Sequence, residues 1–158
     1  MIKIIDGNLF DSKANIICHQ CNCQGVMGSG VAAEVKRRYP HVFETYRRDY
    51  EQGRLEPGYV CFVSTNNKKE DYSQVIANMC GQDKYGYDGN QYTNYLGLEQ
   101  CLNEVLNYAL DMYYKRPTIA FPYLMSCCRG GGDWNVVYKM IEDKFSDFDV
   151  EIWRLDNG

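Results

Sequence analysis

Residues 18–32, CHQCNCQGVMGSGVA, carry side chains and spacings that could support two different kinds of chemistry. The first half places three cysteines around one histidine: Cys18, His19, Cys21 and Cys23. Thiolate and imidazole groups are ligands that zinc prefers. The second half places three glycines before an amphipathic run: Gly25, Gly28 and Gly30. Because glycines let the backbone approach a ligand and helix N-terminal amides attract anions, this half predicts a phosphate site.

A second glycine-rich segment, CCRGGGDW at residues 127–134, repeats the order of strand, glycines and helix. Asp133 stands where the N-cap of that helix would lie, and a carboxylate there accepts hydrogen bonds from backbone amides. The G-x-x-G-x-G spacing of the first segment matches neither the Rossmann fingerprint nor a P-loop, so glycine spacing alone is a weak signal. Since ligands of parallel sheets bind beyond the carboxyl ends of strands, the two segments could grip one diphosphate from both sides.

The elements that must position these segments alternate between strand-like and helix-like patterns. Strand-like segments lie at residues 2–5, 14–21, 57–65, 73–81, 117–123 and 149–155. Helix-like segments lie at residues 31–39, 40–53, from an N-cap at Thr93 to residue 113, and 133–145. This alternation predicts an α/β domain whose helices pack on a mainly parallel or mixed sheet.

Periodicity within the segments predicts which side chains face inward. In the long helix they are Leu98, Leu102, Val105, Ala109 and Tyr113. In the last strand they are Val150, Ile152 and Leu155. Strand alternation also places Cys18 and Cys21 on opposite sides of the sheet, which argues against a metal ion shared between them.

Length and composition restrict the class of protein further. The 158 residues, 45% of them hydrophobic, suit one folded domain spanning residues 1–158. The net charge of −4, from 17 basic and 21 acidic side chains, argues against direct sequence-specific binding of nucleic acid. The N-terminus lacks a signal-peptide pattern, and no stretch approaches the roughly 20 apolar residues that span a membrane. We therefore expect a cytoplasmic monomer that needs no membrane and no cofactor.

The stretch GNLFDSKANIICHQCNCQGVMGSGVAAEVKRRYP, residues 7–40, resembles the opening of a macrodomain. The pieces G-N-L, H-Q-x-N and G-V-M-G-S-G-V-A occur in the family's order, followed by ANMCGQDKYGYDGNQYTNY and by FPY…GGGDWNVVYKMIEDKF. The likeness is to the Appr-1-p processing (ADP-ribose-1″-phosphate phosphatase-like) branch, which is close to the terminal ADP-ribose protein glycohydrolases. It implies a three-layer α/β/α fold with a mixed central sheet.

The resemblance also implies roles for particular residues. Asn8 stands where the family has an aspartate that accepts from the adenine amino group, and Asn22 where it has the asparagine beside the distal ribose. Residues 28–31 and 126–130 stand where it has two phosphate-binding loops. The implied ligand-binding residues are Asn8, Leu9, Asn22, Gly28, Ser29, Gly30, Val31, Gln82, Ser126, Cys127, Cys128, Arg129 and Gly130.

The second segment departs from the family's pattern, which is rich in glycine at this point. Side chains occupy three of the expected glycine positions: Leu124, Ser126 and Cys128. If those positions need a positive φ, the side chains impose backbone strain. Arg129 would then either place a cation on a phosphate or lie solvated at the surface.

The family's glycohydrolase type uses a lysine at a strand end and an aspartate in the second loop, and both look absent here, with Asn78 near the lysine position. His19 and Asp133 are the predicted catalytic residues. His19 could act as a general base or acid, or be a structural histidine. Asp133 could orient a water molecule, or only cap its helix. Tyr85, Tyr87 or Tyr92 could stack on a base from a lid or only pack their own loop.

Taken with the resemblance, the sequence predicts a protein that binds ADP-ribose or a related NAD-derived nucleotide, free or attached to a protein or nucleic-acid target. It also predicts hydrolysis at the distal ribose, removing ADP-ribose from a target or a 1″-phosphate from the nucleotide. The alternative is a reader that binds without turnover. A zinc-bearing interaction module is a third, weaker interpretation.

Overall fold

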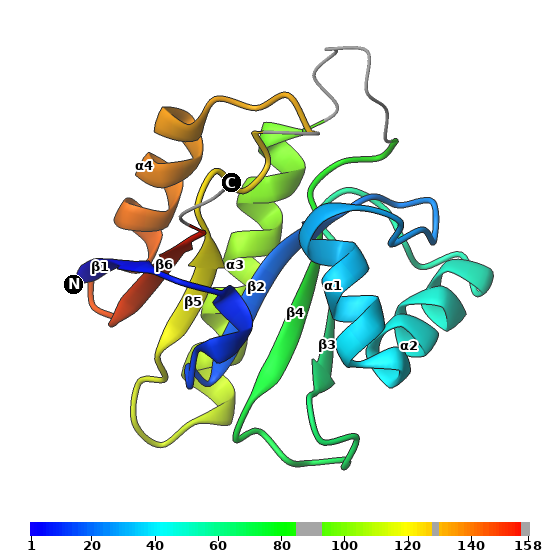
Figure 1. Cartoon of the computed structure of the whole chain (residues 1–158), viewed down its shortest axis with the longest axis horizontal. Coiled ribbons are helices and arrows are strands. Elements are labelled where there is room, and N and C mark those ends of the chain that lie inside the picture. The colour runs from blue at the N-terminus through cyan, green and yellow to red at the C-terminus, as the bar shows by residue number, and fades with distance from the viewer. Residues whose placement is uncertain (85–92, 128–129, 156–158) are drawn as a thin grey trace.

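The computed structural model describes residues 1–84, 93–127 and 130–155, which form three layers (Figure 1). In this part of the chain a six-stranded sheet lies between two pairs of helices. The helices are α1 (Gly30–Arg38), α2 (Pro40–Glu51), α3 (Tyr95–Met112) and α4 (Trp134–Lys144). The first pair packs on one face of the sheet and the second pair on the other, so the predicted three-layer α/β/α fold is confirmed.

The sheet is mixed, as the sequence predicts. Its strands are β1 (Ile2–Asp6), β2 (Ile16–Cys21), β3 (Val60–Ser64), β4 (Val75–Cys80), β5 (Ile119–Pro122) and β6 (Val150–Arg154). Their order in the sheet is β1-β6-β5-β2-β4-β3. All neighbouring strands run parallel except β3, which pairs with β4 in the antiparallel direction.

The central strand β2 contributes to both hydrophobic cores because its side chains alternate between the two faces. Ile16 and Cys18 pack with residues of α3 and α4. Ile17 and Cys21 pack with residues of α1 and α2. Each fully buried aliphatic side chain stabilises the fold by about 1.5–3 kcal/mol relative to exposure. The predicted placement of Cys18 and Cys21 on opposite faces is therefore confirmed.

The parallel strands determine where the functional segments lie. Because β2, β4 and β5 are parallel, their carboxyl ends meet at one edge of the sheet. Residues 22–30, the first loop, leave β2 there and lead into α1. Residues 123–132, the second loop, leave β5 at the same edge and lead into α4. Two segments separated by about a hundred positions in sequence thus face one another.

Two details differ from the sequence-based predictions. Thr93 does not cap the long helix: the N-cap is Asn94, whose side chain accepts from the Gly97 amide at 2.9 Å. Thr93 is instead buried and bonded to the second loop. Leu155 does not face the core, because β6 ends at Arg154, and its side chain is 62% exposed.

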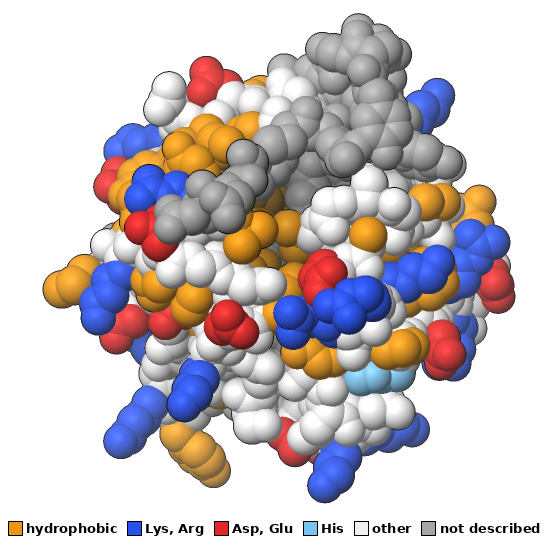
Figure 2. Space-filling model, in the orientation of Figure 1, with side chains coloured by type: hydrophobic (Ala, Val, Ile, Leu, Met, Phe, Trp, Pro, Cys, Tyr) orange, Lys and Arg blue, Asp and Glu red, His pale blue; other side chains and the backbone are white. Residues whose placement is uncertain are grey.

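The surface of the described residues mixes charges of both signs. On the face drawn in Figure 2, Lys and Arg side chains lie among Asp and Glu side chains and apolar patches. Several basic residues of α1 and α2 have acidic partners one helical turn away, including Arg38 with Glu34 at 2.8 Å. In the described segments, no helix combines the length and the apolar character needed to cross a membrane.

Candidate functional site

A cavity of about 210 Å³ lies at the carboxyl edge of the sheet, between the first and second loops. Its walls come from the end of β2, the first turn of α1, Gln82 after β4, and the second loop after β5. The lining residues are His19, Gln20, Ser29, Gly30, Val31, Ala32, Gln82, Pro122, Tyr123, Leu124, Met125, Ser126 and Gly130. None of these is Lys, Arg, Asp or Glu, so within the described chain a ligand would meet backbone and neutral groups.

The start of α1 presents backbone amides to this cavity. Ser29 is the N-cap residue, and its side chain makes no capping hydrogen bond. The backbone amide of Ala33 reaches the carbonyl of Ser29 at 3.2 Å, whereas the earlier amides of the turn precede the helical ladder. Gly30 has φ +60°, a conformation that glycine adopts without strain. A helix N-terminus of this kind is a favourable position for an anion.

Asn22 holds the first loop in shape. Its amide nitrogen donates to the carbonyl of Val26 at 3.0 Å, and its amide oxygen accepts from the Gln24 backbone at 2.9 Å. The buried hydroxyl of Tyr46 on α2 donates to the Asn22 carbonyl at 2.7 Å. Asn22 is 9% exposed and does not line the cavity. These bonds show how the loop is built, and the predicted contact with a ribose stays a prediction.

The second loop has a strained backbone at two positions where the resembled family has glycine. Leu124 has φ +60° and Ser126 has φ +73°, both in the left-handed region that favours glycine. Such a conformation costs a non-glycine residue roughly 1–2 kcal/mol. The conditional prediction of strain at these two positions is therefore confirmed. Strained residues of this kind concentrate at binding sites, where the surrounding structure compensates for them.

A network of side-chain hydrogen bonds ties the second loop to β2. The Gln20 amide nitrogen donates to Oε1 of Gln82 at 2.7 Å and to Oγ1 of Thr93 at 3.0 Å. The Ser126 hydroxyl donates to Oε1 of Gln20 at 2.5 Å. The Thr93 hydroxyl donates to the carbonyl of Ser126 at 2.8 Å. Sequence reasoning missed Gln20 and Thr93 as site residues, although a glutamine at the carboxyl end of a mostly apolar strand was an available signal.

His19 is buried at 1% exposure and pairs with Asn78 of the neighbouring strand β4, with 2.6 Å between Nε2 and Oδ1. The Asn78 amide nitrogen donates to the carbonyl of Cys61 at 2.9 Å, so its oxygen faces His19. Nε2 therefore carries the ring proton, and Nδ1 keeps a lone pair. Burial lowers the pKa of His19 from 6.5 to about 4, against the smaller opposing effect of the Asn78 hydrogen bond. The imidazole is neutral at pH 7.

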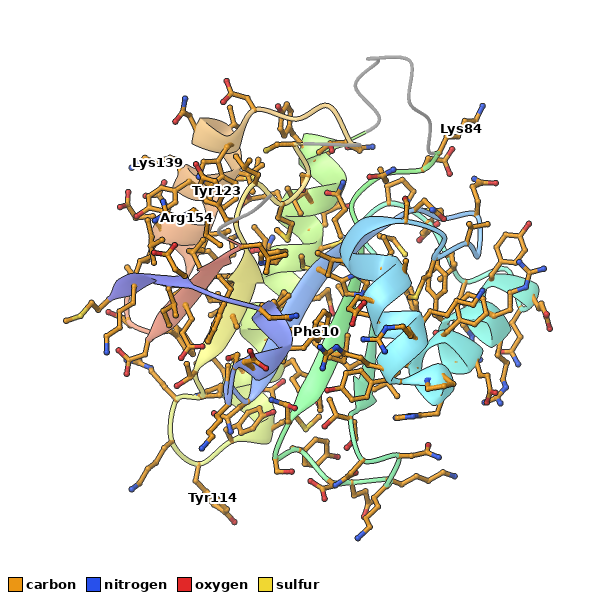
Figure 3. The ribbon with its side chains drawn as sticks, in the orientation of Figure 1. Phe10, Lys84, Tyr114, Tyr123, Lys139 and Arg154 are labelled. Atoms are coloured by element: carbon orange, nitrogen blue, oxygen red, sulfur yellow. The ribbon has the colours of Figure 1, made fainter. Side chains whose placement is uncertain are left out.

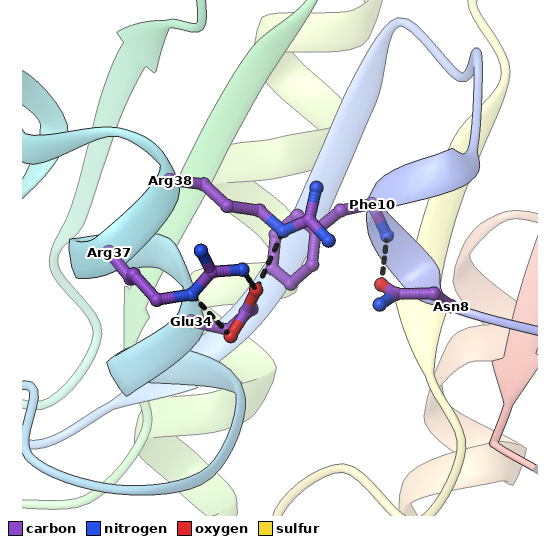
Figure 4. A network of polar contacts seen from close by, with 5 residues as sticks. All are labelled: Asn8, Phe10, Glu34, Arg37 and Arg38. Carbon is purple, nitrogen blue, oxygen red and sulfur yellow. Dashed lines mark hydrogen bonds and ion pairs between the residues drawn. The ribbon is translucent and has the colours of Figure 1, made fainter.

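The side chains of Asp133 and Asn8 both cap the N-terminus of a helix. Asp133 is the N-cap of α4, and its carboxylate accepts from the Asn135 amide at 2.9 Å. The side chain of Asn8 caps the short 3-10 helix Leu9–Asp11 and accepts from the Phe10 amide at 2.9 Å (Figure 4). Phe10 in turn lies under the Arg38 guanidinium, whose carbon is 5.2 Å from the ring centre. The capping alternative considered for Asp133 is thus observed.

The cavity gathers some of the predicted site residues and not others. Those in its walls are His19, Ser29, Gly30, Val31, Gln82, Ser126 and Gly130. Those described but outside its walls are Asn8, Leu9, Asn22, Gly28, Cys127 and Asp133. Cys128, Arg129 and the proposed lid tyrosines Tyr85, Tyr87 and Tyr92 lie outside the described residues.

Tyr123 is a lining residue that sequence reasoning missed. Its ring packs edge-on against Trp134, with ring centres 5.4 Å apart. Arg154, labelled near Tyr123 in Figure 3, has its guanidinium carbon 5.7 Å from the Tyr123 ring centre. Arg154 is itself bonded to Asp6 at 2.8 Å. Tyr123 is half-buried, so one part of this fixed aromatic ring borders the cavity.

The cysteines do not form a metal site in the part of the chain that the structure describes. No group of three or more His, Cys, Asp or Glu side chains there is arranged to hold a metal ion. Cys18 and Cys21 are fully buried, and burial raises the pKa of both thiols well above 9.0. Both thiols are therefore protonated at neutral pH and pack as small apolar side chains.

Comparisons with known proteins converge on one family. The model of the Macro domain matches residues 18–141 of this chain. A DNA ADP-ribosyl glycohydrolase of Mycobacterium tuberculosis is 35% identical over 65 residues, covering 41% of this chain and 18% of that protein. An ADP-ribose 1″-phosphate phosphatase of Ajellomyces capsulatus is 40% identical over 53 residues, covering 33% and 21%. The matched stretches thus span only about a fifth of each enzyme.

Other similarities extend over the whole chain. An uncharacterized 17.5 kDa protein of enterobacteria phage T4 is 25% identical over 155 residues, covering 96% of this chain and 95% of that protein. The macrodomain of M. tuberculosis DarG superposes with a TM-score of 0.80 at 24% identity, covering 97% of both chains. Thermosipho africanus DarTG in complex with ADP-ribose gives a TM-score of 0.78 at 19% identity, covering 99% of this chain and 42% of that one. These structural similarities show the fold.

The close packing around Gly130 generates a prediction about stability. A Cβ atom at Gly130 would lie 2.1 Å from Oγ1 of Thr93 and 2.7 Å from the carbonyl of Ser126. We expect Gly130→Ala to reduce the free energy of unfolding by about 2 kcal/mol or more, because the second loop must shift. Gly28→Ala is the matched control, since its Cβ would meet nothing closer than 3.5 Å. Urea unfolding measures both, and equal losses would contradict the packing described here.

The buried neutral imidazole generates a prediction about pH. Because folding lowers the pKa of His19 from 6.5 to about 4, the unfolded chain takes up a proton before the folded chain does as the pH falls. The contribution of the neutral His19 to the free energy of unfolding is therefore complete above pH 6.5. It is lost progressively as the pH falls from 6.5 to about 4. We expect the stability of the parent relative to His19→Gln to fall by about 3 kcal/mol between pH 7.5 and pH 4. Urea unfolding at several pH values measures this difference, and a constant difference would show that His19 is not buried as a neutral group.

Proposed function

The chain belongs to the macrodomain family, and from that premise we propose that its cavity binds ADP-ribose. The observation that carries this proposal is the pairing of two loops across one cavity. The uncapped first turn of α1 lies on one side, and the left-handed backbone at Leu124 and Ser126 lies on the other. Backbone amides on two sides of the cavity would suit a diphosphate, and none of the described wall residues is Lys or Arg.

The two halves of the nucleotide would extend from the diphosphate in opposite directions. A cavity of about 210 Å³ is smaller than the roughly 300–1,000 Å³ of pockets that enclose drug-sized ligands. It would therefore hold the diphosphate with part of the nucleotide, leaving the remainder against neighbouring surface. Tyr123 offers an aromatic face for stacking. Asn8 and Asn22 keep the adenine and distal-ribose roles that the family resemblance implies.

A second candidate function is hydrolysis at the distal ribose. The names of two relatives support it, one being a DNA ADP-ribosyl glycohydrolase and the other an ADP-ribose 1″-phosphate phosphatase. His19 supports it as well, because it borders the cavity and its Nδ1, which lies 3.8 Å from Sγ of Cys21, is unprotonated. An imidazole whose pKa is about 4 is a weak base, so its contribution would be to accept a hydrogen bond from water or a ribose hydroxyl. We therefore place binding first and turnover second.

Calorimetry with ADP-ribose tests the binding function. We expect the parent chain to bind ADP-ribose, and to bind adenosine more weakly because adenosine lacks the diphosphate. Ala32 lies in the cavity wall at the first turn of α1. Ala32→Glu is expected to weaken ADP-ribose binding about tenfold relative to Ala32→Gln, because only the glutamate adds a negative charge beside the phosphates.

Two results would overturn this assignment. No heat of binding with millimolar ADP-ribose would remove ADP-ribose as the ligand. Equal affinities of the Glu and Gln variants would show that the phosphates lie elsewhere. Thermal unfolding of both variants controls for folding, and a glutamate in the first turn of a helix is itself stabilising.

Turnover assays distinguish the hydrolase from the reader. Substrates are ADP-ribosylated DNA, ADP-ribosylated protein and ADP-ribose 1″-phosphate. If the chain is a hydrolase, we expect His19→Gln to lower kcat about a hundredfold while the affinity for ADP-ribose changes little. We also expect a rate that is constant above about pH 5 and falls toward pH 4, as His19 becomes protonated. Full turnover by His19→Gln would remove the histidine from the mechanism, and no turnover on any substrate would leave the reader function.

A further inference from the structure

Gln20 stands at the centre of the contacts that hold the second loop. Its carboxamide has two N–H donors, and both are used, by Gln82 at 2.7 Å and Thr93 at 3.0 Å. Its oxygen accepts from the Ser126 hydroxyl at 2.5 Å. An amide whose donors are all engaged has no N–H left for a phosphate or a ribose. Gln20 therefore borders the cavity without a donor to offer a ligand.

Two glycines provide the space that this carboxamide occupies. A Cβ atom at Gly81 would lie 2.4 Å from Oε1 of Gln20. A Cβ atom at Gly130 would lie 2.9 Å from its Nε2. Because any side chain at either position would displace the amide, the backbone on both sides is shaped around Gln20. Gly81 belongs to the segment after β4, and Gly130 belongs to the second loop.

The residue that Gln20 holds is the strained one. Ser126 has φ +73°, and a serine relaxes from that conformation unless other contacts oppose it. Its hydroxyl is bonded to Gln20, and its carbonyl accepts from Thr93 Oγ1 and from the Gly132 amide, both at 2.8 Å. Since Gln20 also orients Thr93, it supports Ser126 through the side chain directly and through the carbonyl indirectly.

We propose that Gln20 is a positioning residue that fixes the second loop in its ligand-binding conformation by clamping Ser126. This inference rests on the proposed function, because the clamped loop is the one assigned to the diphosphate. Gln20 acts through Ser126 and Thr93 and does not touch the ligand. The clamp replaces glycine: where a glycine would adopt the left-handed conformation unaided, this chain keeps a serine and bonds it in place.

A double-mutant cycle without ligand tests the clamp itself. Gln20→Met keeps the side-chain volume and removes the three hydrogen bonds, and Ser126→Gly removes the strain that the clamp opposes. We expect Gln20→Met to lower the Tm by about 4 °C in the parent and by less than half of that in the Ser126→Gly background. An equal loss in both backgrounds would overturn the clamp, because Gln20 would then be a structural amide with no specific effect on Ser126.

Binding measurements test what the clamp does for the site. We expect Gln20→Met to weaken ADP-ribose binding about tenfold in the parent chain. In the Ser126→Gly background we expect the same substitution to weaken ADP-ribose binding about threefold or less. Gln74→Met is the matched control. Its amide also donates two hydrogen bonds, to the carbonyls of Ser12 and Ala14 at 3.1 and 3.0 Å, at the opposite end of the sheet. We expect it to lower stability by a similar amount and to leave the affinity for ADP-ribose unchanged.

The outcomes separate the two proposals. If the parent chain does not bind ADP-ribose, the proposed function fails, while the thermal cycle still decides whether the clamp exists. If the parent binds and Gln20→Met binds equally well, Gln20 does not position the site. If Gln74→Met weakens binding as much as Gln20→Met does, the effect is general loss of stability and the positioning role is wrong.

Discussion

Backbone amides beyond the carboxyl end of a parallel strand have no neighbouring strand to pair with. The arrangement of the two loops at this edge of the sheet depends on how those amides are satisfied. In this chain β2 and β5 are neighbours, so their two following loops meet across one cavity. The first loop satisfies its own polar groups through Asn22 and Tyr46, which leaves the first turn of α1 facing the cavity. The proposed function depends on these amides staying available to a ligand and unpaired with other groups of the chain.

The energetics of the second loop show how a glycine-poor sequence can keep such a shape. Left-handed conformations at Leu124 and Ser126 together cost roughly 2–4 kcal/mol. A hydrogen bond between neutral groups contributes a net of about 0.5–1.5 kcal/mol. Three bonds link Gln20 to Gln82, Thr93 and Ser126, so the network and the strain are of similar size. In the proposed clamp, side-chain bonding supports at Ser126 a conformation that glycine would adopt through its backbone freedom.

Local sequence patterns predict the parts of the structure that local physics controls. The mostly apolar run at residues 16–21 predicts a buried strand, and the helical period of α3 predicts its buried face. Asp133 is the N-cap of α4 and ends the second loop, as expected. The clamp could not be predicted in this way, because Gln20 and Ser126 are 106 positions apart and meet only when β2 and β5 pair. Thr93 was misassigned for the same reason: the N-cap of α3 is the next residue, Asn94, and the Thr93 hydroxyl is used in a tertiary bond to Ser126. The role of Asn78 likewise depends on its register opposite His19.

The pairing of His19 with Asn78 limits the chemistry of the site. A lysine or a carboxylate opposite the imidazole would give the site a charge, whereas Asn78 provides only a neutral acceptor. Burial then keeps the ring unprotonated across the physiological pH range. None of the described wall residues of the cavity is Lys, Arg, Asp or Glu, so in the proposed function these walls attract a diphosphate through oriented backbone dipoles. Because such dipoles act only over short distances, the proposed diphosphate site depends on how close the second loop lies to the first turn of α1.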